Sequence, residues 1–122
     1  CNVTMEISGY DRNNEFVSKE KVEEKWFFDI GKKSVKVISA PRAVFLDKIY
    51  ETAIDKDKIG LSGEDKRLDV NIEHTWYGSI KIDRSTGQVR GRQMYVQKRK
   101  PNSFELTTIS GDCAKTSRKK KF

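Results

Sequence analysis

The stretch from Leu68 to Gln97, LDVNIEHTWYGSIKIDRSTGQVRGRQMYVQ, has the pattern of two strands joined by a tight turn. Its first half alternates, with Val70, Ile72, His74 and Trp76 on one face and Asn71, Glu73, Thr75 and Tyr77 on the other. A period of two is typical of a strand with one buried face. The residues Arg84-Ser85-Thr86-Gly87 are typical of a tight turn. Gly87 is placed to adopt the left-handed conformation that closes a type I turn with a bulge. The stretch therefore predicts a hairpin whose return strand runs from Gln88 to about Gln97.

Strand-like patterns recur along the rest of the chain, and turn residues separate them. They cover residues 3–7, 26–30, 35–37, 44–54, 59–61 and 104–108. Ser62 to Lys66 reads as a loop, and Ser18 to Lys25 is the one segment that could form a short helix. Consecutive turns indicate neighbouring antiparallel strands. We expect an all-β antiparallel meander of about seven to nine strands, closed as a small barrel or packed as a two-sheet sandwich, with at most one short helix.

The size and composition of the chain fit a single folded domain. Of its 122 residues, 35% are hydrophobic and 35% are charged, and two Trp, four Tyr and six Phe provide bulk for one core. No apolar run approaches the roughly 20 residues that a membrane-spanning helix requires. The chain opens at Cys1 instead of Met, which indicates a processed mature form or a trimmed chain.

The two cysteines lie at opposite ends, at Cys1 and Cys113, a spacing that matches neither a zinc nor a redox motif. In an oxidising compartment they would form one disulfide that closes residues 1–113 and leaves residues 114–122 as a basic C-terminal tail. Two alternatives stay open: free thiols in a cytosolic protein, or an acylated Cys1 that anchors a lipoprotein. A bridge would place the first and last strands side by side, since its α-carbons must lie within about 7 Å.

The positive charge of the chain is concentrated in its last third. Residues 1–80 carry 13 basic and 15 acidic side chains, whereas residues 81–100 carry seven basic side chains and one acid, Asp83. The candidate surface for an anionic partner consists of Lys81, Arg84, Arg90, Arg92, Lys98, Arg99 and Lys100. Such a patch attracts phosphates, anionic lipid or an acidic protein, or it serves only as a solvated surface.

The segment from Ile80 to Gly87, with Gly111-Asp112-Cys113 and the ending Lys119-Lys120-Lys121-Phe122, resembles the C-terminal part of small exported proteins of proteobacteria. These proteins share an early cysteine, an IDR-x-TG hairpin, a glycine near a late cysteine and a basic tail. The resemblance covers about the last 45 residues and the position of Cys1. It implies export to the periplasm or beyond and a disulfide, and it does not imply any particular activity.

No pattern in the sequence indicates catalysis, a cofactor or a metal site. His74 is the only histidine and shares a predicted face with apolar residues, which favours packing over catalysis. The Asp55-Lys56-Asp57 stretch lacks the spacing of a calcium loop, and glycine-rich phosphate loops are absent. An enzyme that uses His74 with a carboxylate is therefore the least favoured reading.

The favoured function is an exported, non-enzymatic binding or inhibitor module that acts through the basic hairpin from Lys81 to Lys100. Expected partners are an acidic protein, an anionic lipid or a cell-wall polymer. Nucleic acid is disfavoured as a partner, because Tyr95 lies on the opposite face of the strand from Arg90 and Arg92 and an exported compartment holds little nucleic acid. The alternative is a carrier of small apolar ligands, with a lipocalin-like barrel cavity lined by Trp26, Phe28 and Trp76.

Overall fold

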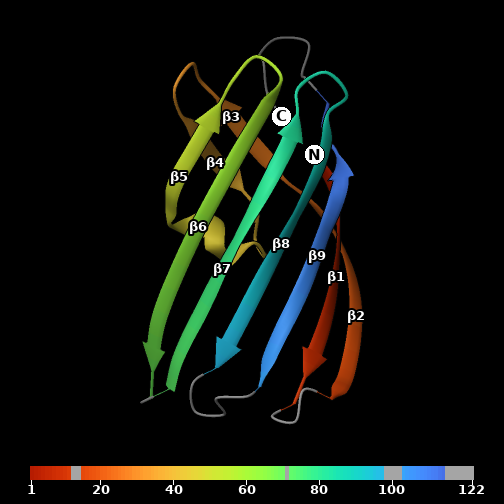
Figure 1. Cartoon of the computed structure of the whole chain (residues 1–122), viewed down its shortest axis with the longest axis vertical. Coiled ribbons are helices and arrows are strands. Elements are labelled where there is room, and N and C mark those ends of the chain that lie inside the picture. Colours follow the sequence, from red (N-terminus) through yellow and green to blue (C-terminus); the bar gives the residue numbers. More distant parts are fainter. Residues whose placement is uncertain (12–14, 71, 98–102, 115–122) are drawn as a thin grey trace.

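The computed structural model of the chain describes residues 1–11, 15–70, 72–97 and 103–114 (Figure 1). These residues form nine strands and one short 3-10 helix, so the all-β prediction is confirmed. The elements are β1 (Asn2–Tyr10), β2 (Phe16–Lys25), β3 (Phe27–Ile30), β4 (Val35–Ser39), η1 (Val44–Asp47), β5 (Ile49–Ile54), β6 (Lys58–Asp69), β7 (Ile72–Asp83), β8 (Gln88–Gln97) and β9 (Phe104–Asp112).

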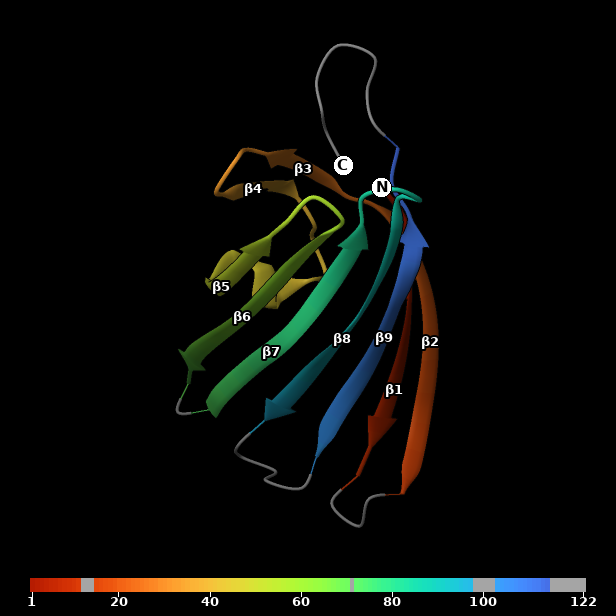
Figure 2. The same ribbon diagram turned by 45° about the horizontal axis from the view of Figure 1, so that its top comes forward.

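Seven of the strands form one antiparallel sheet in the order β2-β1-β9-β8-β7-β6-β5, and β3 and β4 form a separate hairpin. The edge strands β2 and β5 do not pair with each other, so the sheet stays open. The closed-barrel alternative was therefore wrong and the two-sheet alternative was right. In Figures 1 and 2 the hairpin lies behind the sheet, at the end of the strand order where β5 and β6 lie.

The first and last strands of the domain are neighbours, as the cysteine positions predicted. Strand β1 pairs with β9 in a register that sets Asn2 opposite Asp112. Just beyond this pair, Cys1 and Cys113 form a disulfide across a sequence separation of 112. A Cys1 sulfur in this bridge cannot also carry a thioether-linked lipid, so a lipoprotein anchor at Cys1 would require Cys113 to be free.

The core fills the space between the hairpin and one face of the large sheet, which we call the inner face. Trp26 and Phe28 pack edge to face, with ring centroids 6.2 Å apart, and both are almost fully buried. They meet apolar side chains from the sheet and from η1, namely Val3, Met5, Ala43, Phe45, Leu46, Ile59, Leu61, Ile80, Ile82, Val89 and Ile109. Because side chains alternate along a strand, the residues between these sheet positions point to the opposite, outer face.

Segment 18–25 is part of β2 and not a helix. It pairs along its whole length with β1, and Val22 lies opposite the buried Met5. Its exposed positions carry many charged side chains, which suit a strand at the edge of a sheet because they discourage pairing with other chains. The tertiary pairing with β1 therefore overrides the weak local signal for a helix.

Three further boundaries differ from the sequence-based expectation. The strand expected from Leu68 begins only at Ile72, because Leu68 and Asp69 end β6 and Val70 adopts a φ of +47° in the turn that follows. Residues 44–47 form η1, because Phe45 and Leu46 are consecutive and both buried, which a strand cannot achieve on one face. Residues 62–66, expected as a loop, continue β6. The buried Asp65 is accommodated there because Arg67 forms an ion pair with it at 2.8 Å.

The predicted turn at Gly87 is confirmed. Its φ of +81° lies in the left-handed region, and its amide donates to the carbonyl oxygen of Asp83 at 2.7 Å. A Cβ at Gly87 would overlap the carbonyl oxygen of Cys113, so glycine is also required by close packing. The turn therefore fixes the register of the β7–β8 hairpin.

Candidate anion-binding surface

Three cationic side chains of the β7–β8 hairpin gather on the outer face of the sheet. Lys81 lies directly opposite Arg90, and Arg92 is the next residue on that face of β8. All three are exposed. Like charges at directly opposite positions destabilise a sheet, so this arrangement has an electrostatic cost.

No acidic side chain lies directly opposite these cations on the neighbouring strands, and the exposed Asp112 on β9 lies diagonally from Arg90 without forming an ion pair with it. Lys81 faces Gly60 on β6, and Arg90 faces Ser110 on β9. Arg92 faces Thr108. Within the described ranges, Lys81, Arg90 and Arg92 take part in none of the ion pairs. Their positive charge is therefore available to an external anion.

These side chains line one side of an open depression of about 1130 Å³ on the sheet. The depression crosses five strands, from β7 to β2, and hydroxyl groups supply further hydrogen-bond donors along it. The hydroxyl-bearing residues that line it are Thr4, Ser79, Thr108 and Ser110. Cationic and hydroxyl donors together suit a phosphate, sulfate or carboxylate group.

The depression is not uniformly basic. Glu23 and Asp112 line it away from Lys81, near β2 and the end of β9, together with Lys25. Glu24 also reaches its rim, but its carboxylate accepts a hydrogen bond from the Trp26 indole at 3.0 Å. An anion is therefore best placed on the β7–β8 side, which we call the cationic cluster: Lys81, Arg90 and Arg92.

The other residues of the predicted basic surface do not join this cluster in the described part of the chain. Arg84 sits in the β7–β8 turn, where its guanidinium donates to the carbonyl oxygen of Asp55 at 2.8 Å. Lys98, Arg99 and Lys100 lie outside the described residues, as does the basic tail beyond Ala114.

His74 belongs to an aromatic cluster on the inner face. Its ring stacks on Trp76 and Tyr95, with centroids 5.9 and 5.8 Å away, and its Nδ1 shares a 2.5 Å hydrogen bond with the Tyr95 hydroxyl. Burial raises the pKa of Tyr95, and the nearby Glu105 carboxylate raises it further. Arg67 lies over the Trp76 ring at 5.3 Å. These contacts give His74 a packing role, and its predicted lack of a catalytic role stays a prediction.

The aromatic residues assigned to a barrel cavity do not surround a common space. Phe28 on β3 and Trp26 just before it are core residues, whereas Trp76 stacks on Tyr95 at 4.9 Å. Since the sheet is open, the enclosed barrel that the carrier hypothesis required is not formed. A carrier function as such stays a prediction.

The described residues contain no group of three or more His, Cys, Asp or Glu side chains placed to hold a metal ion. None of the helices among these residues has the length and apolar character to cross a membrane.

The chain matches no model of a protein family, and no curated protein sequence or solved structure is significantly similar to it. The resemblance to exported proteobacterial proteins and the compartment that it implies therefore stay predictions. The disulfide itself is compatible with an oxidising compartment.

The sequence located the cationic residues of the site and missed most of its lining. Lys81 and Arg90 could be placed opposite each other because a short turn fixes their register. Thr108 and Ser110 come from β9, and Thr4 comes from β1. No short-range pattern links those strands to the hairpin, although the cysteine positions did indicate that β1 and β9 are neighbours.

Proposed function

We propose that this chain is an exported, non-enzymatic binding protein that holds an anionic partner over the cationic cluster. The observation that carries the proposal is the direct opposition of Lys81 and Arg90, with Arg92 beside them. An arrangement of like charges that costs stability, and whose members form no ion pair among the described residues, is expected where a ligand supplies the opposite charge.

The surroundings of the cluster support the same role. The three cations share a depression with several hydroxyl groups, so charge and hydrogen bonds converge on one concave surface. The core and the hairpin lie on the other face of the sheet, which gives the surface a rigid base. Binding there can block or sequester a partner without any chemical step.

Charge reversal at the cluster tests this function. The double variant R90E/R92E removes two positive charges and adds two negative ones within the depression. The matched control K33E/K36E makes the same change in net charge on the β3–β4 hairpin, where Lys33 and Lys36 are exposed. Retention on an immobilised heparin column, eluted with a salt gradient, serves as the probe of binding to anions.

We expect R90E/R92E to elute at a clearly lower salt concentration than K33E/K36E, because screened electrostatic attraction depends on where the charges lie. Circular dichroism spectra must first show that both variants fold like the wild type. Equal elution of the two variants would mean that net charge alone governs retention, and the proposed function would then be abandoned.

A further inference from the structure

The outer face of the sheet changes character along its strands, from basic at the cationic cluster to apolar farther on. The next cross-strand row beyond Arg92 consists of Tyr77, Met94 and Leu106. Tyr77 and Leu106 are 38% and 39% exposed, large values for apolar side chains in the middle of a sheet. The β3–β4 hairpin covers the inner face and does not reach this outer surface.

A second apolar row follows the first. It consists of Val96, Phe104 and Tyr10, and the rings of Tyr10 and Phe104 stack with centroids 5.0 Å apart. The two rows together form a continuous apolar surface across β7, β8, β9 and β1, which we call the apolar rows. They begin where the depression that contains the cationic cluster ends.

From this arrangement we propose that the anionic partner is a single amphiphile, an anionic lipid molecule whose headgroup binds the cationic cluster and whose hydrocarbon chain lies on the apolar rows. The inference rests on the proposed function, since it uses the same cluster. From Arg92 to Val96 the strand rises by about 13 Å, so an alkyl chain of about ten carbons can lie along it. The hydroxyls of Thr108 and Ser110 are placed to bond the headgroup.

The two-part surface favours this occupant over the other anionic partners. An acidic protein or a charged polymer would explain the cationic cluster but would leave the adjoining apolar rows exposed to water. A flat bilayer surface fits poorly, because the cations line a hollow and not a protruding edge. One extended amphiphile matches both the charge and the apolar surface along a single strand direction.

Three ligands separate the contribution of the anionic headgroup from that of the alkyl chain. Decyl phosphate, kept below its micelle concentration, carries both; inorganic phosphate lacks the chain; decyl maltoside lacks the charge. Isothermal titration calorimetry should give decyl phosphate an affinity at least about tenfold above that of inorganic phosphate, because burying methylene groups adds favourable free energy. In NMR spectra of the wild type, decyl phosphate should shift the methyl signals of Met94 and Leu106.

Substitutions on the apolar rows complete the test. The variant M94T/L106T keeps strand-forming residues at the half-buried Met94 and the exposed Leu106 while it removes their apolar surface. We expect its affinity for decyl phosphate to fall to that for inorganic phosphate, and its heparin retention to stay at the wild-type value. Its control is I38T on β4, since Ile38 is 53% exposed on the other layer. That variant should bind decyl phosphate as the wild type does.

The outcomes distinguish this inference from the function on which it rests. If R90E/R92E loses heparin retention but decyl phosphate binds no tighter than inorganic phosphate, the anion-binding function stands and the lipid inference fails. Three results would each overturn the proposal that one lipid molecule binds here. These are wild-type affinity of M94T/L106T for decyl phosphate, methyl signals of Met94 and Leu106 that do not shift, and binding to phosphatidylglycerol vesicles but not to decyl phosphate. Heparin retention that is insensitive to R90E/R92E removes both proposals.

Discussion

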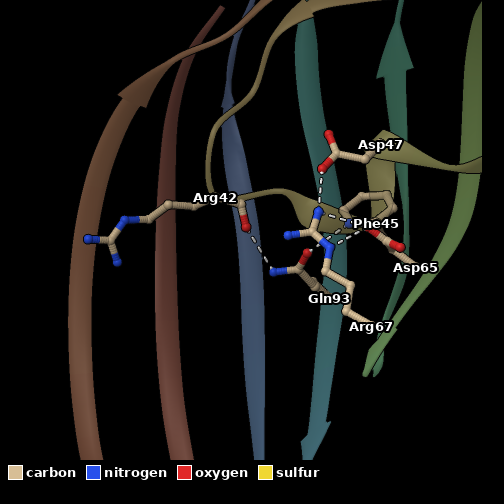
Figure 3. Close-up of polar contacts among 6 residues, drawn as sticks. All are labelled: Arg42, Phe45, Asp47, Asp65, Arg67 and Gln93. Atoms are coloured by element: carbon tan, nitrogen blue, oxygen red, sulfur yellow. Dashed lines mark hydrogen bonds and ion pairs between the residues drawn. The ribbon is translucent and has the colours of Figure 1, made fainter. Parts of the chain in front are cut away.

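The side chain of Gln93 on β8 holds the backbone around Phe45 against the inner face of the sheet. Its Oε1 accepts a hydrogen bond from the Phe45 amide at 3.3 Å, and its Nε2 donates to the Arg42 carbonyl oxygen at 3.1 Å (Figure 3). Nearby, Arg67 pairs with both Asp47 and Asp65. The segment before β5 is thus attached to the sheet by polar contacts as well as by its buried apolar side chains.

Replacing Gln93 by Leu should lower the free energy of unfolding by about 1–3 kcal/mol, because the buried Phe45 amide would lose its acceptor. Gln93 is only 6% exposed, so water cannot readily replace the lost bonds. Urea unfolding followed by circular dichroism measures the change. The control Q88L alters an exposed glutamine on the same strand. Equal effects of the two substitutions would contradict the role assigned to Gln93.

Removing the disulfide should also destabilise the fold. A bridge across a sequence separation of 112 restricts the unfolded chain strongly, so the variant C1S/C113S should lose up to about 5 kcal/mol in the chain-entropy model. Urea unfolding of the variant and the oxidised wild type gives the difference. Adding a reducing agent should weaken the wild type and leave C1S/C113S unchanged. A loss below about 1 kcal/mol would show that the bridge contributes little.

The state of the cysteines also tests the predicted compartment. In protein purified from its native host, the intact mass should be two hydrogens below that of the reduced chain, and alkylation should add two groups only after reduction. Two thiols that react without reduction would place the chain in a reducing compartment. A lipid adduct on Cys1 would instead support the alternative of a membrane-anchored lipoprotein.

The limits of sequence-based prediction for this chain follow from how local each feature is. The hairpin around Gly87 depends on alternation and one turn, so it could be predicted together with the opposition of Lys81 and Arg90. Asp65 can occupy a buried position in β6 because it forms an ion pair with Arg67. Segment 18–25 forms a strand because it pairs with β1. Neither partner is indicated by the local sequence. The sheet is open because β3 and β4 pair only with each other and leave β2 and β5 as its edges, which neither turn residues nor the cysteine positions specify.

The Asp83 carboxylate should make the fold more sensitive to acid. It accepts hydrogen bonds from the Ser85 hydroxyl and from the Thr86 and Ser85 amides, which lower the pKa of Asp83 below its usual 3.8. A pKa that is lower in the folded state means that this carboxylate stabilises the fold above about pH 4. That contribution is lost as the pH falls through the folded-state pKa.

An NMR titration of the side-chain carboxyl carbons should therefore place the Asp83 midpoint below 3.8. In the variant D83N, unfolding stability should fall less on acidification than in the wild type, because the neutral amide does not titrate. D29N, which removes one negative charge on β3, controls for the change in net charge. If D83N and D29N show the same dependence on pH, the turn hydrogen bonds do not carry the effect.

Val70, at the end of β6, occupies a backbone conformation that suits other residues better. Its φ of +47° lies in the left-handed region, which is strained for a β-branched side chain, and the residue is 82% exposed. Substituting Asn should therefore raise the free energy of unfolding by roughly 1 kcal/mol, since Asn tolerates this region and little buried surface is lost. The thermal midpoint should rise accordingly. The control L68N changes a residue of β6 that is 75% exposed and has no positive φ, so it should not raise the free energy of unfolding. A V70N variant no more stable than the wild type would show that Val70 carries no backbone strain.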